Sequence, residues 1–280
     1  MYSEQDIADY YDQTRAHFLQ SWDLSKVGAL HYGFWFPGTK TFEESLRNTS
    51  AYAGKLAELE SGMNILDAGC GEGGSSILIA DMFSVNSHGV TLSERQVNAA
   101  INRASKAKVS SAQFSCQSYV STNFEAGSFD AVIAIESFSS AQKSSEFFKE
   151  THRILKPGGR LVIFDFFKVS EIPIENLPSL KTFLNCWAIH DIETTDSMME
   201  LYKSHNFKLV SAENVNDLIM PSAKRMKRFG YLGAFGTKVY NFFWNAAPWS
   251  KNHYKSGIHQ WKSLKRGEWF YGVFTGRKAQ

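Results

Sequence analysis

Short apolar segments alternate with amphipathic segments through the middle of the chain. Runs such as 129–135 and 160–167 are apolar on both faces, whereas segment 144–155 has apolar residues at helical spacing. Strands that are apolar on both faces are typical of parallel sheets that helices cover on each side, so the pattern predicts an α/β fold. The expected strands are residues 63–67, 88–92, 112–116, 129–135, 160–167, 207–212 and 268–277, and the expected helices are residues 73–83, a helix opening at Ser93, and residues 144–155 and 194–205.

The two ends of the chain differ from this middle region in their aromatic content. Residues 1–36 hold nine aromatic residues and residues 216–280 hold fourteen, out of 40 in the whole chain. Segments 170–192 and 216–260 also fall between the expected strands and helices. The ends therefore carry added material beside an alternating α/β core.

Composition excludes several classes of protein. The 280 residues carry a net charge of +2, which is too small for a strongly basic nucleic-acid binder. Three widely spaced cysteines form neither a disulfide framework nor a zinc-ligand pattern, so we expect no metal site. No run of about 18 apolar residues occurs, and the acidic N-terminal segment lacks the pattern of a signal peptide. We expect a cytoplasmic protein without membrane insertion.

A glycine-rich segment between a predicted strand and a predicted helix carries the strongest chemical signal. It reads Asp67-Ala-Gly69-Cys-Gly71-Glu-Gly73, and such a loop brings backbone N–H groups and a helix N-terminus to a ligand. The spacing also satisfies a dinucleotide-binding pattern. However, the second strand ends Thr91-Leu92-Ser93, without the acid that holds a ribose in nicotinamide-dependent enzymes. The missing acid argues against an oxidoreductase, which is kept as one alternative. A cofactor-binding protein without catalysis is another.

Three motifs together resemble the class I S-adenosylmethionine-dependent methyltransferases: the glycine segment, residues 129–137 with Glu136-Ser137 at their end, and Leu155-Lys-Pro-Gly-Gly159. Residues 91–96 and 31–35 are similar to the branch with tocopherol, sterol, prenyl-diphosphate and cyclopropane-fatty-acid enzymes. The resemblance implies a Rossmann-like seven-stranded sheet whose last strand is antiparallel. It also implies an N-terminal helical lid (1–60), a cofactor-binding core (61–215), a helical lid insertion (216–260) and a closing helix and strand (261–280).

The resemblance also implies roles for individual residues. Glu136, His31 and Tyr11 match catalytic positions. Positions near the cofactor, S-adenosyl-L-methionine, are matched by Tyr32, Asp67, Gly69, Cys70, Gly71, Gly73, Thr91, Leu92, Gln96, Ser118, Tyr119 and Ile135. The expected lining of the acceptor pocket comprises Trp35, Phe138, Trp187, His190, Phe235 and Trp244.

The aromatic ends of the chain favour a small, apolar acceptor. We expect methylation at carbon of an isoprenoid or lipid-like secondary metabolite, because aromatic faces stabilise a cation. Methylation at oxygen of a phenolic molecule is the alternative. Relatives often have a histidine where this chain has Ser140, and Ser139 stands where cyclopropane synthases have a bicarbonate-holding glutamate, which disfavours cyclopropanation. The chain could also form a homodimer.

Overall fold

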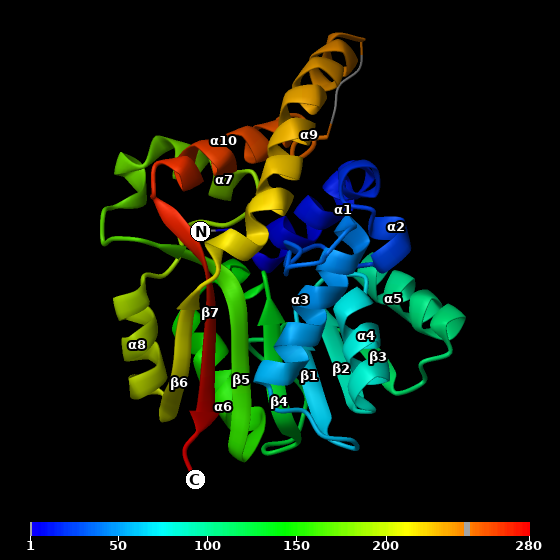
Figure 1. Ribbon diagram of the computed structural model, residues 1–280, viewed down its shortest axis with the longest axis vertical. Coiled ribbons are helices and arrows are strands. Elements are labelled where there is room, and N and C mark those ends of the chain that lie inside the picture. Colours follow the sequence, from blue (N-terminus) through cyan, green and yellow to red (C-terminus); the bar gives the residue numbers. More distant parts are fainter. Residues whose placement is uncertain (1, 244–246) are drawn as a thin grey trace.

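A seven-stranded sheet forms the centre of the molecule (Figure 1). The computed structural model describes residues 2–243 and 247–280. The strand order is β3-β2-β1-β4-β5-β7-β6; the first five strands run parallel, and β7 is antiparallel to both of its neighbours. This topology confirms the predicted methyltransferase sheet. The strands are β1 (Asn64–Ala68), β2 (Asn86–Thr91), β3 (Ala112–Cys116), β4 (Phe129–Ile135), β5 (Leu155–Lys168), β6 (Phe207–Asn214) and β7 (Trp269–Lys278).

Helices cover both faces of the sheet because alternate strand residues point to opposite sides. Ile133 of β4 belongs to one buried cluster, with α3 and α4, whereas its neighbour Val132 belongs to a second, with α6 and α8. The helix α5 packs beside β3 and β2. These helices are α3 (Phe42–Leu56), α4 (Gly74–Phe83), α5 (Glu94–Ala107), α6 (Ser144–Ile154) and α8 (Thr195–Ser204).

The fifth strand begins earlier than the sequence pattern predicted. We expected a helix over residues 144–155 and a strand over residues 160–167, but β5 starts at Leu155. Leu155 pairs with Phe129 of β4, and a shift in register separates this pair from the next, Ala131 with Arg160. The Lys-Pro-Gly-Gly segment 156–159 therefore bulges between two paired positions of one strand, which the local sequence alone does not reveal.

Helix α1 (Glu4–Ser21) lies across the carboxyl ends of the parallel strands, followed by the single turn α2 (Leu24–Val27) (Figure 1). Hydrogen bonds join α1 to the loops that follow three different strands, because polar residues recur along the face that it turns toward the sheet. The loops after β1, β2 and β3 each contribute one contact. The contacts join Arg15 to Glu72 (2.5 Å), Asp12 to Ser93 (2.7 Å) and Glu4 to Ser118 (2.5 Å).

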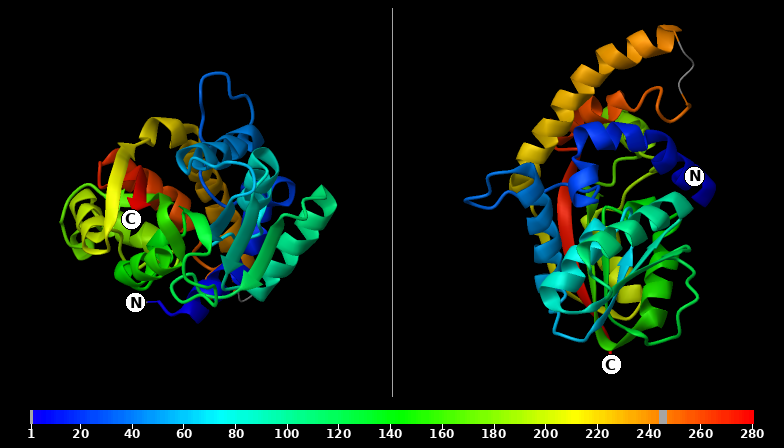
Figure 2. Two further views of the ribbon diagram at one scale, coloured as in Figure 1. Left: turned by 90° about the horizontal axis from the view of Figure 1, so that it is seen from below. Right: turned by 90° about the vertical axis from the view of Figure 1, so that its right-hand side faces the viewer.

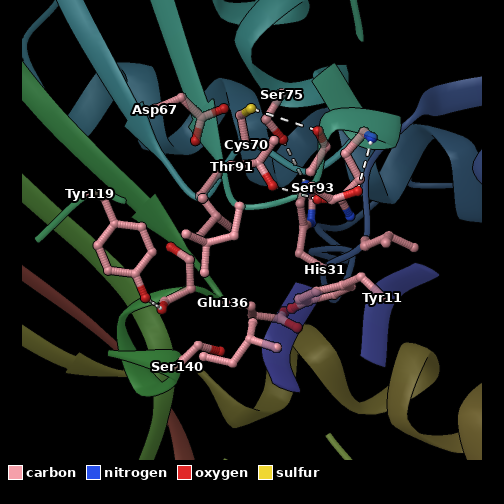
Figure 3. Close-up of a pocket in the computed structure, with 18 of the residues that line it drawn as sticks. Tyr11, His31, Asp67, Cys70, Ser75, Thr91, Ser93, Tyr119, Glu136 and Ser140 are labelled. Atoms are coloured by element: carbon pink, nitrogen blue, oxygen red, sulfur yellow. Dashed lines mark hydrogen bonds between the residues drawn. The ribbon is translucent and has the colours of Figure 1, made fainter. Parts of the chain in front are cut away.

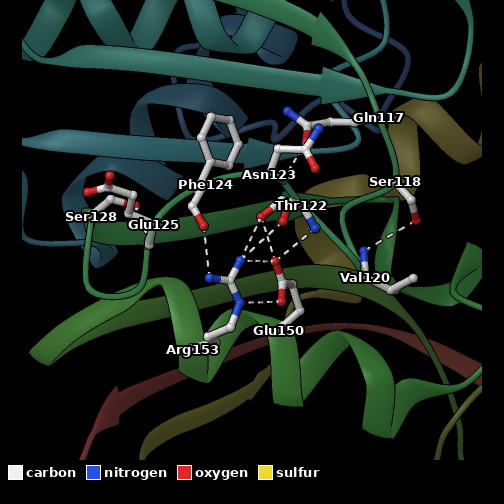
Figure 4. A network of polar contacts seen from close by, with 10 residues as sticks. All are labelled: Gln117, Ser118, Val120, Thr122, Asn123, Phe124, Glu125, Ser128, Glu150 and Arg153. Atoms are coloured by element: carbon white, nitrogen blue, oxygen red, sulfur yellow. Dashed lines mark hydrogen bonds and ion pairs between the residues drawn. The ribbon is translucent and has the colours of Figure 1, made fainter.

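The loop between β3 and β4, residues 117–128, is fixed by a pair of charged side chains on α6 (Figure 4). The guanidinium of Arg153 donates to the carbonyl oxygens of Phe124 (2.8 Å) and Thr122 (3.2 Å). The carboxylate of Glu150 accepts from the backbone N–H of Thr122 (2.8 Å) and binds Arg153 (2.6 Å). Satisfying these loop groups holds the polypeptide just after Tyr119 against the body of the protein.

The remaining elements form a helical layer beyond the carboxyl edge of the sheet. Figures 1 and 2 show α9 extending past α10 and away from the sheet. A Cβ atom added to Gly257 would lie 2.4 Å from the carbonyl oxygen of Met226, so the two helices cross at backbone contact. The elements of this layer and its connections are η1 (Phe138–Ser140), η2 (Ile174–Asn176), α7 (Pro178–Asn185), α9 (Asn216–Phe243) and α10 (Tyr254–Lys265). The division of the chain into lids and core stays a prediction.

Candidate cofactor cavity and acceptor site

A cavity opens at the carboxyl ends of β1, β2 and β4, beneath α1 (Figure 3). Its empty volume, which includes space open to solvent, is about 730 Å³. Most of the predicted cofactor and catalytic residues meet here. They are Tyr11, His31, Asp67, Gly69, Cys70, Gly71, Thr91, Leu92, Gln96, Tyr119, Ile135 and Glu136.

The glycine loop after β1 forms one wall of this cavity. Gly69, Gly71 and Gly73 all have positive φ angles (+87°, +54° and +79°), which glycine adopts without a steric penalty. A Cβ atom on Gly69 would lie 2.4 Å from Cβ of Ser137, so glycine is required there for packing. At Gly71 the nearest atom to such a Cβ is Gln96 Nε2 at 4.0 Å, so this side of the backbone faces open space. The backbone at Gly71 is therefore accessible to a ligand.

Asp67 places a carboxyl group at the base of the glycine loop. Its side chain is 3% exposed, and the hydroxyl of Ser76 donates to Oδ2 at 2.5 Å. Burial raises the pKa of Asp67 to about 6, while the hydrogen bond from Ser76 opposes that rise. The group is thus mainly a carboxylate at neutral pH, and a cation in the cavity would favour this charged form.

A polar pair lies at the end of β2. Thr91 donates to Gln96 Oε1 at 2.5 Å, and Ser93 caps α5 by accepting the N–H of Gln96 at 3.2 Å. Because the amide oxygen of Gln96 is occupied by Thr91, the amide nitrogen is the end that turns toward Gly71. This arrangement presents a donor to the cavity in a fixed orientation.

Glu136 follows β4 and has an unusual backbone conformation for a residue with a side chain. Its φ angle is +52°, in the left-handed region. Oε1 accepts the N–H of Tyr32 at 2.5 Å and the hydroxyl of Tyr271 at 2.7 Å. Burial raises the pKa of Glu136 well above its usual value and the nearby Asp165 raises it further, although both hydrogen bonds oppose the rise. The carboxyl group is held in one position, and its raised pKa makes its carboxylate a stronger base than that of an ordinary glutamate.

His31 is less suited to act as a base. Nδ1 faces the carbonyl oxygen of Tyr32 at 3.0 Å, so it carries the hydrogen, and Nε2 lies 3.0 Å from the hydroxyl of Ser75. Burial lowers the pKa of His31 to about 4, so the ring is neutral at pH 7. Both ring nitrogens are already engaged, which favours a structural role in holding the loop before Gly33.

Tyr11 reaches the cavity from α1 and lies near Ser140 (Figure 3). Burial raises the pKa of Tyr11, as do the charges of Glu136 and Asp165, and a hydrogen bond with Ser140 opposes this. The phenol therefore stays protonated and can serve as a hydrogen-bond donor beside Glu136.

Three predicted cofactor residues do not line this cavity. The hydroxyl of Tyr32 donates to Gln260 at 2.8 Å within the core, so only its backbone serves Glu136. Gly73 packs against Ala100 and Phe114, and Ser118 bonds to α1. The resemblance placed these residues by their position in a motif, whereas the side chains of Tyr32 and Ser118 bond elsewhere and the backbone of Gly73 packs against α5 and β3. The lining residues that sequence reasoning missed are Ile7, Ala8, Ala29, Leu30, Ser75, Ser93, Ser137 and Ser140.

A second cavity of about 920 Å³ adjoins the first, because Ile7 and Ser140 line both. Phe138 and His190, two of the residues expected to line the acceptor pocket, line this cavity. Much of its remaining lining is polar and includes Lys168, which binds the carboxylate of Asp191 at 2.9 Å. This cavity is therefore the candidate acceptor site, with a more polar wall than the aromatic content of the chain suggested.

Three other residues expected to line the acceptor pocket lie elsewhere. The indole of Trp35 donates to Ser222 at 3.0 Å and packs against the core. Trp187 packs against Phe166, with 5.6 Å between ring centroids, and is not among the residues that line either cavity. Phe235 is 76% exposed on α9, and Trp244 lies outside the described residues. Aromatic composition thus did not identify the lining, because the rings of Trp35, Trp187 and Phe235 pack against other residues or face solvent.

Comparison with known proteins agrees with this fold. A family profile described as a methyltransferase domain matches residues 59–225. The O-methyltransferase cnsE of Penicillium expansum is 26% identical over 239 residues, covering 84% of this chain and 84% of that protein. The structure of the [4+2]-cyclase SpnF superposes with a TM-score of 0.81 and 21% identity, covering 99% of this chain and 96% of the other.

A geranyl diphosphate C-methyltransferase from Streptomyces coelicolor A3(2) gives a TM-score of 0.75 at 16% identity, covering 99% of this chain and 97% of the other. The structural matches share the fold, and the family profile covers more than half of this chain. These findings confirm the resemblance inferred from the glycine loop and its companion motifs. The chain belongs to the methyltransferase domain family and is a class I S-adenosylmethionine-dependent small-molecule methyltransferase.

Proposed function

We propose that this chain methylates an oxygen atom of a small, largely apolar secondary metabolite, and that Glu136 takes up the proton that the acceptor loses. The observation that carries the proposal is the carboxyl group of Glu136, which borders the cofactor cavity and whose pKa burial raises. General bases work best when their pKa lies near the operating pH. The neutral, fully engaged His31 meets this requirement less well.

The residues around the first cavity fit S-adenosylmethionine. The carboxylate of Asp67 suits an ammonium group, and the open backbone at Gly71 permits close approach. The oriented amide of Gln96 suits ribose hydroxyls, and the ring of Tyr119, fixed by its hydrogen bond to Ser137 at 2.6 Å, suits a purine. When bound, the cofactor supplies an electrophilic methyl group attached to a positively charged sulfur.

The protein's own contribution is to position the acceptor and to exclude water. Because α1 spans the carboxyl edge of the sheet, it covers the cofactor cavity and borders the second cavity through Ile7. Holding two reactants in one orientation lowers the entropic barrier to displacement, and no covalent intermediate with the protein is needed. Tyr11 donates a hydrogen bond beside Glu136 and helps to orient the acceptor's hydroxyl.

The lining of the second cavity favours oxygen as the methylated atom. Hydroxyl, carboxylate and ammonium groups from Ser140, Asp191 and Lys168 face it, and they suit an acceptor with hydroxyl or carbonyl groups. Methylation at carbon of an isoprenoid or lipid-like acceptor is the second candidate. The rings of Tyr11, Phe138 and Phe166 at the two cavities support it, since aromatic faces stabilise a carbocation and Glu136 could then remove its proton.

Isotope labelling separates the two candidates. The purified protein is incubated with S-adenosylmethionine carrying a ¹³C-labelled methyl group and with panels of phenols, polyketide alcohols and prenyl compounds. A labelled methoxy carbon in the product supports methylation at oxygen, and a labelled carbon-bound methyl group supports the second candidate. If the protein binds the cofactor but methylates no member of any panel, whereas a related O-methyltransferase does so under the same conditions, the proposal is wrong.

A further inference from the structure

The C-terminal helices α9 and α10, with the segment that joins them, carry a positive charge that the rest of the molecule lacks. Residues 218–267 contain ten Lys and Arg residues and no Asp or Glu, whereas the remaining residues contain 20 basic and 28 acidic ones. The small net charge of the chain therefore conceals a strong separation between an acidic body and a basic layer. Such a layer attracts anionic partners.

One face of α9 carries a continuous exposed stripe. Lys224, Arg228, Tyr231 and Phe235 are spaced four, three and four residues apart, so they follow one another along the same side of the helix. Tyr231 and Phe235 are 55% and 76% exposed, and Leu232 beside them is 70% exposed. The basic residues lie nearer the body of the protein and the large apolar residues lie farther out.

The opposite face of α9 is fixed to the protein. Ile219, Ala223 and Met226 are buried, and a Cβ atom on Gly230 would lie 3.0 Å from the carbonyl oxygen of Tyr254 on α10. Close backbone contact sets the direction of α9, which carries the stripe outward beyond α10 (Figures 1 and 2). Tyr231, Leu232 and Phe235 are therefore exposed because the opposite face of α9 is packed against the protein.

We propose that this stripe docks the protein on the surface of an anionic phospholipid bilayer, with Tyr231, Leu232 and Phe235 in the interface and Lys224 and Arg228 beside the phosphates. The order along the helix matches the order of layers in a membrane, where apolar chains lie deeper than charged headgroups. None of the described helices has the length and hydropathy that crossing a membrane requires, so the association is peripheral. An acidic protein partner would not require exposed apolar residues beyond the basic residues of the stripe.

A third cavity connects this stripe with the interior of the helical layer. It has an empty volume of about 990 Å³ and lies between α1, α9 and α10. Leu232 and Gly233 border it at the stripe, and Trp22, Met226 and Phe229 supply apolar lining farther in. The docking surface itself does not depend on which atom the enzyme methylates.

Vesicle sedimentation tests the proposal with the full chain. The wild-type protein should bind vesicles that contain phosphatidylglycerol and should bind pure phosphatidylcholine vesicles weakly. Added salt should remove the electrostatic part of this binding and leave the apolar part. The double variant Lys224→Gln/Arg228→Gln should bind about 30-fold more weakly, since each basic residue near the surface contributes about a fivefold factor. The variant Leu232→Ser/Phe235→Ser should lose binding that remains at high salt.

Matched controls separate the stripe from general charge. Lys106→Gln/Lys149→Gln removes the same charge from exposed positions on α5 and α6 and should leave vesicle binding unchanged. Thermal unfolding and S-adenosylhomocysteine affinity should be unchanged in all variants, which shows that they fold. The proposal is overturned if the wild-type protein does not bind vesicles that contain phosphatidylglycerol. It is equally overturned if the control variant loses as much vesicle binding as Lys224→Gln/Arg228→Gln does. It is also overturned if sedimentation shows a dimer that Leu232→Ser/Phe235→Ser dissociates, because a second copy would then cover the stripe.

Discussion

Replacing Glu136 by glutamine tests the proposed base with little disturbance of the fold. Glutamine keeps an oxygen where Oε1 accepts from the N–H of Tyr32 and the hydroxyl of Tyr271. It cannot accept a proton, however, so the contribution of general base catalysis should be lost. We expect kcat to fall about 10²- to 10⁴-fold, which corresponds to about 3–5.5 kcal/mol in the activation free energy.

A companion variant changes the pKa of the same carboxyl group without removing the group. Tyr271→Phe deletes one of the two hydrogen bonds to Oε1 and destabilises the carboxylate form by about 1.5–3 kcal/mol. Because that hydrogen bond lowers the pKa of Glu136, its loss raises the pKa, and the acidic limb of the pH–rate profile should move to higher pH. A merely structural role for Tyr271 would lower the melting temperature and leave the position of this limb unchanged.

The assay combines steady-state kinetics with calorimetric titration of S-adenosylhomocysteine. Glu136→Gln should bind the cofactor product with nearly the affinity of the wild-type protein, since the proposed cofactor contacts come from other residues. If kcat of Glu136→Gln stays within tenfold of the wild-type value across the pH range, the proton goes elsewhere and the assignment is refuted. His31→Asn should then be measured next.

Other predictions concern cofactor binding and the contacts of α1. Gly71→Val should abolish S-adenosylmethionine binding in calorimetry, because the side chain strains a positive φ angle and enters the cavity, whereas Gly38→Val, also at positive φ but with no neighbour within 4 Å, should bind normally. Asp67→Asn should weaken binding by about 1–3 kcal/mol; unchanged affinity would contradict the contact with the ammonium group. Since burial raises the pKa of Asp67 to about 6, wild-type affinity should fall as pH drops below 6. The stability of the unliganded protein should respond oppositely: the contribution of this group is full below the unfolded pKa of about 3.9 and is lost as pH rises through 6, which denaturant titrations of wild type and Asp67→Asn would reveal. Arg15→Met leaves buried Glu72 with a weaker partner and should speed hydrogen exchange across α1 by destabilising its docked state by about 1–3 kcal/mol; exchange equal to wild type would show that this ion pair does not hold α1.

Local sequence determined the sheet and the cofactor cavity to a large extent. Alternation of apolar strands with amphipathic helices depends on neighbouring residues, and so does the glycine loop between β1 and α4. Most residues assigned to the cofactor lie in such short motifs, and they meet in one cavity because parallel strands end at the same edge of the sheet. The early start of β5 is an exception, because it depends on pairing with Phe129, which no local pattern reveals.

Tertiary structure decided what the side chains of those motifs do. The hydrogen-bond donors to Glu136 come from residues 104 and 135 positions away, and they convert a strand end into an oriented, buried carboxyl group. The ring of Tyr32 turns into the core although its neighbour His31 reaches the cavity. Phe235 faces solvent although the aromatic content of its segment suggested a pocket. Aromatic residues serve equally well for packing, for lining a pocket and for docking on a surface. Only the contacts between distant segments select among these roles, because burial and hydrogen bonding depend on which segments of the folded chain surround each side chain.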